Sequence, residues 1–387
     1  MKSFNYFQPT EIIFGSGSIN QIGECAKRYG EKCLLVTGSK FPAASPFYKN
    51  IIESLTQAGM IVTQYDGVIP NPTTNVVSDG AKLAKMSGAQ VIIGLGGGSS
   101  MDVAKAIAVE ASHPGTAWDY LHYKTQPSEK TLPIIAISTT SGTGSQVTQC
   151  SVITKTDDLD KSAIWHKNIF PKIAIVDPEL MLTLPAEITQ VTGFDALAHN
   201  FEAYISVGTN PYVETLALEG IRLIVNTLPK LLEDPHNIEY RSKMAWADTL
   251  GGICISSAGV TLPHGLGMQI SGHCPHIAHG LSLAITYPEF IRFTYQYAIN
   301  KFAIVGRIFN SKLNSTDNET AALQCCEEFN SFLKKINLFT GFESVNVTKE
   351  TLRVIADHGQ VLSDYKNNPR VATIDDMYTI LTNCYAR

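Results

Sequence analysis

Short apolar runs alternate with segments of helical periodicity through the first half of this 387-residue chain. The expected strands cover 32–37, 61–65, 90–95, 133–138 and 173–176, and the expected helices between them cover 50–58, 74–87 and 100–109. Strands that alternate with helices are joined by crossover connections and pair in parallel. We therefore expect the first half to form a parallel sheet with helices on both faces.

The second half changes character near Leu184-Pro185, where strand-like runs become rare. Helical spacing of apolar residues marks the stretches 213–232, 240–257, 319–336 and 349–358. We predict an α/β domain over residues 1–184 and a helical domain over residues 185–387. The sequence contains no internal repeat and no low-complexity linker between them.

The bulk composition excludes several classes of protein. A net charge of -5 argues against a general nucleic-acid binder, because phosphate affinity needs a basic face. No apolar run approaches the roughly 20 residues that span a bilayer, and the first ten residues lack the apolar core of a signal peptide. The eight cysteines are scattered without a CxxC pair, which is typical of reduced, cytoplasmic thiols.

Two turns rich in small residues each follow an expected strand. Gly94-Leu-Gly-Gly-Gly-Ser-Ser100 opens an expected helix, and glycines there let backbone amides approach a pyrophosphate. Asp102, close to this turn, is expected to cap the helix or to contact the bound cofactor. Ser138-Thr-Thr-Ser-Gly-Thr-Gly-Ser145 repeats the pattern after the next strand, so both turns are expected to meet at one crevice.

Asp195 and His199 are four residues apart in a stretch of helical pattern, so a helix would place both on one face. An oxygen and a nitrogen ligand so placed can bind one divalent cation. The alternative is a capping box, with Thr192 as N-cap, Asp195 as the acidic residue of the first turn and His199 merely half-buried.

Four of the ten histidines fall within a short downstream segment, which favours the metal site. They are His264, His273, His276 and His279. Imidazole is the commonest transition-metal ligand. Asp195, His199 and two of these histidines would form a set of three nitrogens and one carboxylate, which suits Fe(II) or Zn(II) when one position stays open.

Taken together, these stretches resemble the iron-containing (group III) alcohol dehydrogenases over nearly the full length of the chain. The matching segments are Pro70–Thr73, Gly96–Asp102, Thr139–Thr143, Asp177-Pro178, Thr192–His199, Ala278–Gly280 and Asn368–Arg370. The resemblance implies a Rossmann-like nucleotide domain followed by a helical domain, an arrangement also found in dehydroquinate synthases. It also implies NAD or NADP as cofactor, a small primary alcohol or aldehyde as substrate, and a homodimer.

The resemblance assigns site residues by position. The metal ligands it implies are Asp195, His199, His264 and His279, although His276 is an alternative fourth ligand. The cofactor contacts it implies are Asn71, Gly97, Gly98, Ser99, Thr139, Thr140, Thr143 and Lys161, to which the Gly-rich turn adds Asp102.

The chain departs from the family pattern at two places. Many members carry an acidic residue after the first strand, where this chain has Gly38 and Ser39, followed by Lys40. A carboxylate there would repel the 2′-phosphate of NADP, so its absence favours NADP. Met268 occupies a position that is often a histidine, and we expect His273 to replace it as the catalytic proton relay.

Two other functions are compatible with the same features. A glycerol dehydrogenase or a dehydroquinate synthase would share the two-domain plan, but Asp195 with His199 one turn later argues against both, because their ligand sets differ from this one. A non-catalytic nucleotide- or metal-binding protein is the other alternative, and metal content without turnover would favour it.

Overall fold

The computed structural model describes residues 3–39, 41, 45–155 and 160–387. These residues divide into two compact units. One unit is Phe7–Leu184, and the other combines Pro185–Arg387 with residues 3–6 of the N-terminal segment. Phe7–Leu184 is called the α/β unit below, and the other is called the helical unit.

The α/β unit is built on a six-stranded parallel sheet, as expected from the alternating pattern. Its strands are β1 (Glu11–Phe14), β2 (Lys32–Gly38), β3 (Ile61–Val68), β4 (Val91–Gly96), β5 (Ile134–Ser138) and β8 (Ile173–Val176), in the spatial order β1-β8-β5-β4-β2-β3. A separate antiparallel pair, β6 (Cys150–Lys155) and β7 (Asp160–Trp165), was not expected from the sequence.

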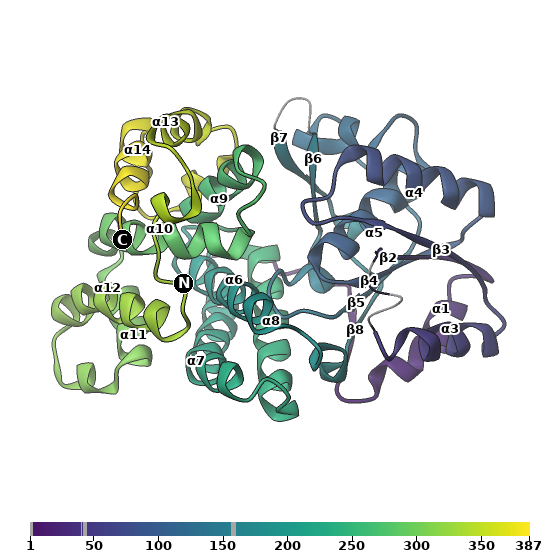
Figure 1. Ribbon diagram of the computed structural model, residues 1–387, viewed down its shortest axis with the longest axis horizontal. Helices are drawn as coiled ribbons and strands as arrows, with labels where there is room; N and C mark the ends of the chain where they lie inside the picture. The colour runs from purple at the N-terminus through teal and green to yellow at the C-terminus, as the bar shows by residue number, and fades with distance from the viewer. Residues whose placement is uncertain (1–2, 40, 42–44, 156–159) are drawn as a thin grey trace. The chain divides into compact units, whose positions relative to one another are not determined.

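Helices cover both faces of this sheet because its strands are apolar on both sides (Figure 1). Successive residues of a strand point to opposite faces. Leu34 and Val36 of β2 therefore join the cluster under α4 (Thr74–Ser87) and α5 (Gly98–Ser112). Cys33 and Leu35, which alternate with them, join the cluster under α1 (Ile22–Lys27) and α3 (Tyr48–Gln57).

The strand order reverses at β2. The chain passes from β2 to the edge strand β3 and then crosses back to β4 on the other side of β2. In open parallel sheets, ligands bind in the crevice outside the carboxyl ends of the strands at such a reversal. The loops that follow β2 and β4 lie at this position.

The helical unit consists of helices joined by short turns (Figure 1). They are α6 (Ala186–Ile205), α7 (Pro211–Glu233), α8 (Ile238–Ala258), α9 (Leu262–His273), α10 (His279–Thr294), α11 (Ile299–Phe309), α12 (Asn318–Lys335), α13 (Lys349–His358) and α14 (Ile374–Asn383). Helix α6 packs against α7, α8 and α10, so the residues of its second half are buried on every side.

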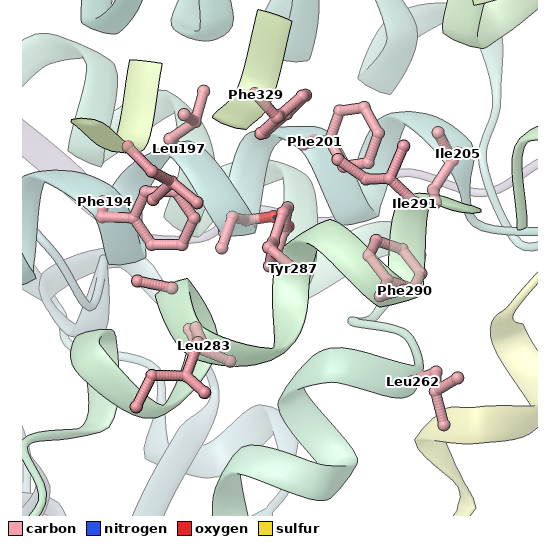
Figure 2. Packing of buried hydrophobic residues seen from close by; sticks show 14 of the residues in the cluster. Phe194, Leu197, Phe201, Ile205, Leu262, Leu283, Tyr287, Phe290, Ile291 and Phe329 are labelled. Carbon is pink, nitrogen blue, oxygen red and sulfur yellow. Dashed lines mark hydrogen bonds between the residues drawn. The ribbon is translucent and has the colours of Figure 1, made fainter. Parts of the chain in front are cut away.

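Aromatic rings fill the centre of the helical unit (Figure 2). The ring of Phe201 on α6 is fully buried, and its centroid lies 5.2 Å from Phe329 and 5.4 Å from Phe302. Tyr287 of α10 joins the same cluster, with its centroid 6.0 Å from Phe201 and 5.2 Å from Phe290. These contacts fix α10 against α6.

Within the described residues, no helix is both long and apolar enough to cross a membrane. All eight cysteines carry free thiols, and seven of them are buried.

We expect Phe201→Ala to lower the free energy of unfolding of the helical unit by about 3–5 kcal/mol, because the surrounding rings would be left around a cavity. Phe201→Leu, which keeps much of the volume, should cost less. Denaturant unfolding followed by circular dichroism measures both changes. Equal stability of the alanine variant and the unchanged protein would contradict the central role of this ring.

Candidate functional site

Asp195 and His199 lie in the interior of α6, ten and fourteen residues into a helix that begins at Ala186. The capping-box alternative is therefore wrong, because Asp195 is more than two turns from the helix start. Thr192 does not cap the helix either, since its hydroxyl donates to the Ile188 carbonyl within α6. The two candidate ligands point from one face of a continuous helix.

The structure brings the four candidate ligands together around one carboxylate oxygen. The Nε2 atoms of His264, His279 and His199 lie 3.5, 3.9 and 4.0 Å from Oδ1 of Asp195. The rings of His199 and His264 stack with centroids 4.5 Å apart, and the His279 ring lies 5.3 Å from that of His264. Ligand atoms of Asp195, His199 and His264 all lie within 4.8 Å of one another.

These atoms suit a divalent cation. Tetrahedral ligands held at about 2.1 Å from a metal lie roughly 3.4 Å apart, so the three Nε2 atoms, at 3.5 to 4.0 Å, need to move only slightly closer to Oδ1 of Asp195. Oδ1 of Asp195 and Nε2 of His264 are buried, and neither has a hydrogen-bond partner among the described residues. Buried polar atoms normally have partners, and a cation at the centre of the cluster would supply one to both.

Glu202 fixes the orientation of His264 from the opposite side of its ring. This fully buried carboxylate accepts a 2.6 Å hydrogen bond from Nδ1 of His264. Its other oxygen accepts hydrogen bonds from the backbone amide of Thr261 at 2.7 Å and from the Thr261 hydroxyl at 3.1 Å. With its proton on Nδ1, His264 presents the lone pair of Nε2 to the cluster, the form that binds metal.

The same carboxylate also positions helix α9. Thr261 is the N-cap of α9, and a carboxylate at a helix N-terminus is stabilised by the helix dipole. The hydroxyl of Tyr287 on α10 lies 3.2 Å from Oε1 of Glu202, within donating distance. Glu202 therefore links the three helices α6, α9 and α10 that carry the four candidate ligands.

The pKa values reflect this concentration of charge. Burial opposes ionisation of Asp195, but the surrounding imidazoles outweigh it and lower its pKa to about 2. Burial likewise disfavours a charged His264, but Glu202 and Asp195 outweigh that effect and raise its pKa to about 10. The site thus attracts positive charge, whether as a proton or as a metal ion.

Two glycines allow His279 to reach the cluster. A Cβ on Gly280, at the start of α10, would overlap the Val191 carbonyl of α6, so the two backbones touch at this point. A Cβ on Gly267 of α9 would lie 3.2 Å from Cε1 of His279. Larger residues at either position would push the His279 ring away from Asp195.

His273 and His276 make other contacts. His273 ends α9, nine residues after His264, which corresponds to about 13 Å along a helix. Its Nε2 lies 3.2 Å from Nδ1 of His358. His276 is exposed, and its Nε2 lies 3.0 Å from the carbonyl oxygen of Val345. The catalytic role of His273 stays a prediction.

In the α/β unit, the first Gly-rich turn joins β4 to α5. Gly97 is the N-cap of α5, and no side chain caps the amides of this helix end within the described part of the chain. A Cβ on Gly98 would lie 2.5 Å from Cγ2 of Thr143, so the second turn packs directly on the first. The arrangement leaves a helix N-terminus of the kind that binds phosphate groups.

The second turn follows β5, the neighbour of β4 in the sheet. The amide of Thr139 donates to the Gly96 carbonyl at 2.9 Å, which joins the two turns. A Cβ on Gly97 would lie 3.2 Å from Oγ1 of Thr140. Ser99, Thr139, Thr140 and Thr143 are thus gathered at the carboxyl ends of two adjacent strands, as the sequence pattern suggested.

Asp102 has a structural role in the α/β unit. Its Oδ1 accepts a 2.6 Å hydrogen bond from the Ser145 hydroxyl, and its Oδ2 accepts a 3.0 Å bond from the Val152 amide. Nζ of Lys105 lies 3.9 Å away, and burial lowers the pKa of this lysine to about 8 against the opposing effect of Asp102. Asp102 therefore ties the second turn and β6 to α5.

The remaining candidate cofactor residues lie at the ends of other elements. Lys161 of β7 donates a 2.9 Å hydrogen bond to Oδ1 of Asn71, which has a positive φ of 50°. Gly38 is the last residue of β2, and Ser39 follows it. Lys40 lies outside the described residues.

Glu202 and Tyr287 are site residues that the sequence analysis missed. Glu202 could have been found, because it lies seven residues after Asp195 and three after His199, on the same face of α6. Tyr287 gave no such signal, since its place beside Glu202 depends on how α10 packs against α6.

We predict that Glu202→Gln will weaken binding of the metal by about 10–100-fold, the usual effect of losing the partner of a ligating histidine. The amide removes a negative charge and places a donor opposite the Thr261 amide. Tyr287→Phe, which removes only one donor to Glu202, should have a smaller effect. Competition with a chelator of known affinity measures both, and unchanged affinity in Glu202→Gln would exclude a role in metal binding.

Comparison with known proteins places the chain in a family. The profile described as "Iron-containing alcohol dehydrogenase" matches residues 9–178, and the C-terminal profile of the same family matches residues 189–385. The NAD-dependent methanol dehydrogenase of Bacillus methanolicus is 29% identical over 98% of this chain and 99% of its own length. The 1,3-propanediol dehydrogenase of Citrobacter freundii is 33% identical over 83% of each chain.

Solved structures agree with this result. An archaeal alcohol dehydrogenase from a Red Sea brine pool superposes with a TM-score of 0.95 at 32% identity, covering 99% of this chain and 100% of the other. A 1,3-propanediol oxidoreductase superposes with a TM-score of 0.94 at 29% identity, with the same coverage. The sequence matches and the structural matches agree, and the chain belongs to the iron-containing alcohol dehydrogenase family.

Proposed function

We propose that this protein interconverts a small primary alcohol and its aldehyde, with hydride transfer to or from a nicotinamide dinucleotide. The observation that carries the proposal is the buried cluster of Asp195 with three imidazoles. Relatives named for methanol, butanol and 1,3-propanediol support the substrate class. When bound, Fe(II) or Zn(II) would supply Lewis acidity toward the substrate oxygen.

Residues of the chain would bind the metal ion and orient its ligands. Asp195 provides the negative charge of the ligand set, and Glu202 keeps His264 in the orientation that presents Nε2. The His279 side chain is 24% exposed, whereas those of Asp195, His199 and His264 are all below 10%. His279 is therefore the ligand of the cluster most exposed to solvent.

The Gly-rich turns of the α/β unit are proposed to bind the dinucleotide. The N-terminus of α5 would receive the pyrophosphate, and the hydroxyls of the second turn would contact phosphate or ribose oxygens. Relatives named as NAD- or NADH-dependent support NAD(H). The absence of a carboxylate at Gly38 and Ser39 leaves NADP(H) acceptable as well, and we propose that both cofactors are used.

We also propose that the protein works as a cytoplasmic homodimer. The family resemblance supports the dimer, and eight free thiols agree with a reducing compartment.

We predict that His264→Ala will lose the metal and nearly all turnover while the chain stays folded. Losing a direct ligand should weaken metal affinity by more than the roughly 10–100-fold that follows the loss of a hydrogen-bond partner of a ligating histidine. Metal analysis of anaerobically purified protein and nicotinamide absorbance with a panel of alcohols and aldehydes provide the measurements. Adding chelator to the unchanged protein should reproduce the loss, and added Fe(II) or Zn(II) should reverse it.

His276→Ala is the matched control for this experiment, because it removes a histidine from the same segment. We expect it to keep both metal content and turnover. Full activity in His264→Ala with equal metal content would refute the assignment of His264. Loss of metal in His276→Ala would point instead to the alternative fourth ligand. Metal binding without turnover across the whole panel would favour a non-catalytic protein.

We predict that Gly38→Asp will reduce kcat/KM for NADPH relative to NADH by at least tenfold, since the new carboxylate would repel the 2′-phosphate. A Cβ at Gly38 would lie 3.5 Å from the Val68 carbonyl, an ordinary contact, so the fold should tolerate the change. Gly38→Asn has the same shape without the charge and should leave the ratio nearly unchanged. An equal shift in both variants would exclude charge as the cause.

A further inference from the structure

Two histidines meet outside the ligand cluster, at the ends of two helices. His273 is the last residue of α9, and His358 is the last residue of α13. Nε2 of His273 and Nδ1 of His358 lie 3.2 Å apart, and the two rings are inclined by 25° with centroids 5.2 Å apart. His358 is exposed and His273 is partly exposed, so solvent reaches the pair.

A hydrogen bond within α9 determines which ring nitrogen of neutral His273 carries the proton. Its Nδ1 lies 2.9 Å from the Gln269 carbonyl oxygen, which can only accept a hydrogen bond. The neutral ring therefore carries its proton on Nδ1 and presents the lone pair of Nε2 to His358. Histidines that bind a metal through one ring nitrogen usually donate a hydrogen bond from the other, often to a backbone carbonyl.

The ends of the two helices that carry the pair are packed against each other. A Cβ on Gly359 would lie 3.3 Å from Cδ2 of Leu266, so the end of α13 packs closely on α9. The His358 carbonyl accepts a 3.0 Å hydrogen bond from the Val361 amide. Two helix C-termini meet at the imidazoles, and the negative ends of their dipoles favour a cation over an anion at this point.

We propose that His273 and His358 form a second binding site for a divalent transition cation of borderline character, such as Zn(II) or Ni(II), with water completing its coordination. Two nitrogens about 2.1 Å from one cation lie roughly 3.0–3.4 Å apart for bond angles between a right angle and the tetrahedral angle. The observed separation of 3.2 Å falls within this range.

This site is independent of the ligand cluster. His273 follows His264 by nine residues on the same helix, about 13 Å along its axis, so one cation cannot occupy both. Binding at the pair would join the end of α13 to the helix that carries His264. A direct hydrogen bond between the two imidazoles would give the same distance, and only the binding of metal distinguishes the two states.

Equilibrium dialysis of the full-length protein against Zn(II), with metal counted per chain, tests the proposal. We expect two equivalents in the unchanged protein, the tighter one at the ligand cluster. His358→Ala should lose the second equivalent, with at least a tenfold weaker affinity, and keep the first. His276→Ala removes a nearby exposed histidine and should keep both.

Thermal unfolding gives a second readout, because a cation that binds only the folded state raises Tm with concentration. Once the first equivalent is bound, further Zn(II) should raise Tm in the unchanged protein but not in His358→Ala. His273→Ala should also lose the second equivalent and its effect on Tm. If His273→Ala does not fold, the result for His358→Ala tests the proposal alone, because His358 is exposed and its loss should not disturb the fold. A protein that binds only one equivalent, or a second equivalent that survives in His358→Ala, would overturn the proposal.

Discussion

The buried carboxylate of Asp195 is the constraint on which the helical unit depends. A carboxylate withdrawn from water is stable only if nearby groups offset its charge, and this one has no hydrogen-bond donor at Oδ1 among the described residues. Three imidazoles from α6, α9 and α10 surround that oxygen instead. The close approach of α10 to α6 at Gly280 and the aromatic cluster around Phe201 serve to bring these rings to one point.

Charge balance explains why Glu202 belongs to the same site. Asp195 and Glu202 together carry two negative charges, which one divalent cation neutralises. Without a cation, a proton on His264 offsets part of that charge, and this is why the pKa of His264 is raised to about 10. A metal that binds at neutral pH must displace this proton, so the two compete for the same position. The hydrogen bonds from Thr261 hold Glu202 in place in either state.

The sequence predicted the parts of the site that depend on helical spacing alone. Asp195 and His199 share a face in any helix, and the parallel sheet followed from its alternating pattern. The choice among four downstream histidines could not be made from spacing, because His264 and His279 lie on different helices separated by a turn. The resemblance to the family supplied that choice. Strand β1 was missed because its residues are exposed or only partly buried, unlike those of the equally short but fully buried β8. The β6–β7 pair was missed because polar residues interrupt its apolar ones.

Asp102 and Asp195 show how a structural carboxylate differs from one held for a ligand. The chain itself supplies the partners of Asp102, with donors from Ser145 and Val152 and a positive charge from Lys105, and its contact with the cofactor stays a prediction. Nothing in that arrangement calls for an external cation. The neighbours of Asp195 are imidazoles, which hold a positive charge only when a proton or a metal ion is bound. A buried carboxylate whose negative charge is neutralised only by a bound proton or metal ion indicates a binding site. A buried carboxylate whose charge is offset by donors and a cation of the chain itself stabilises the fold.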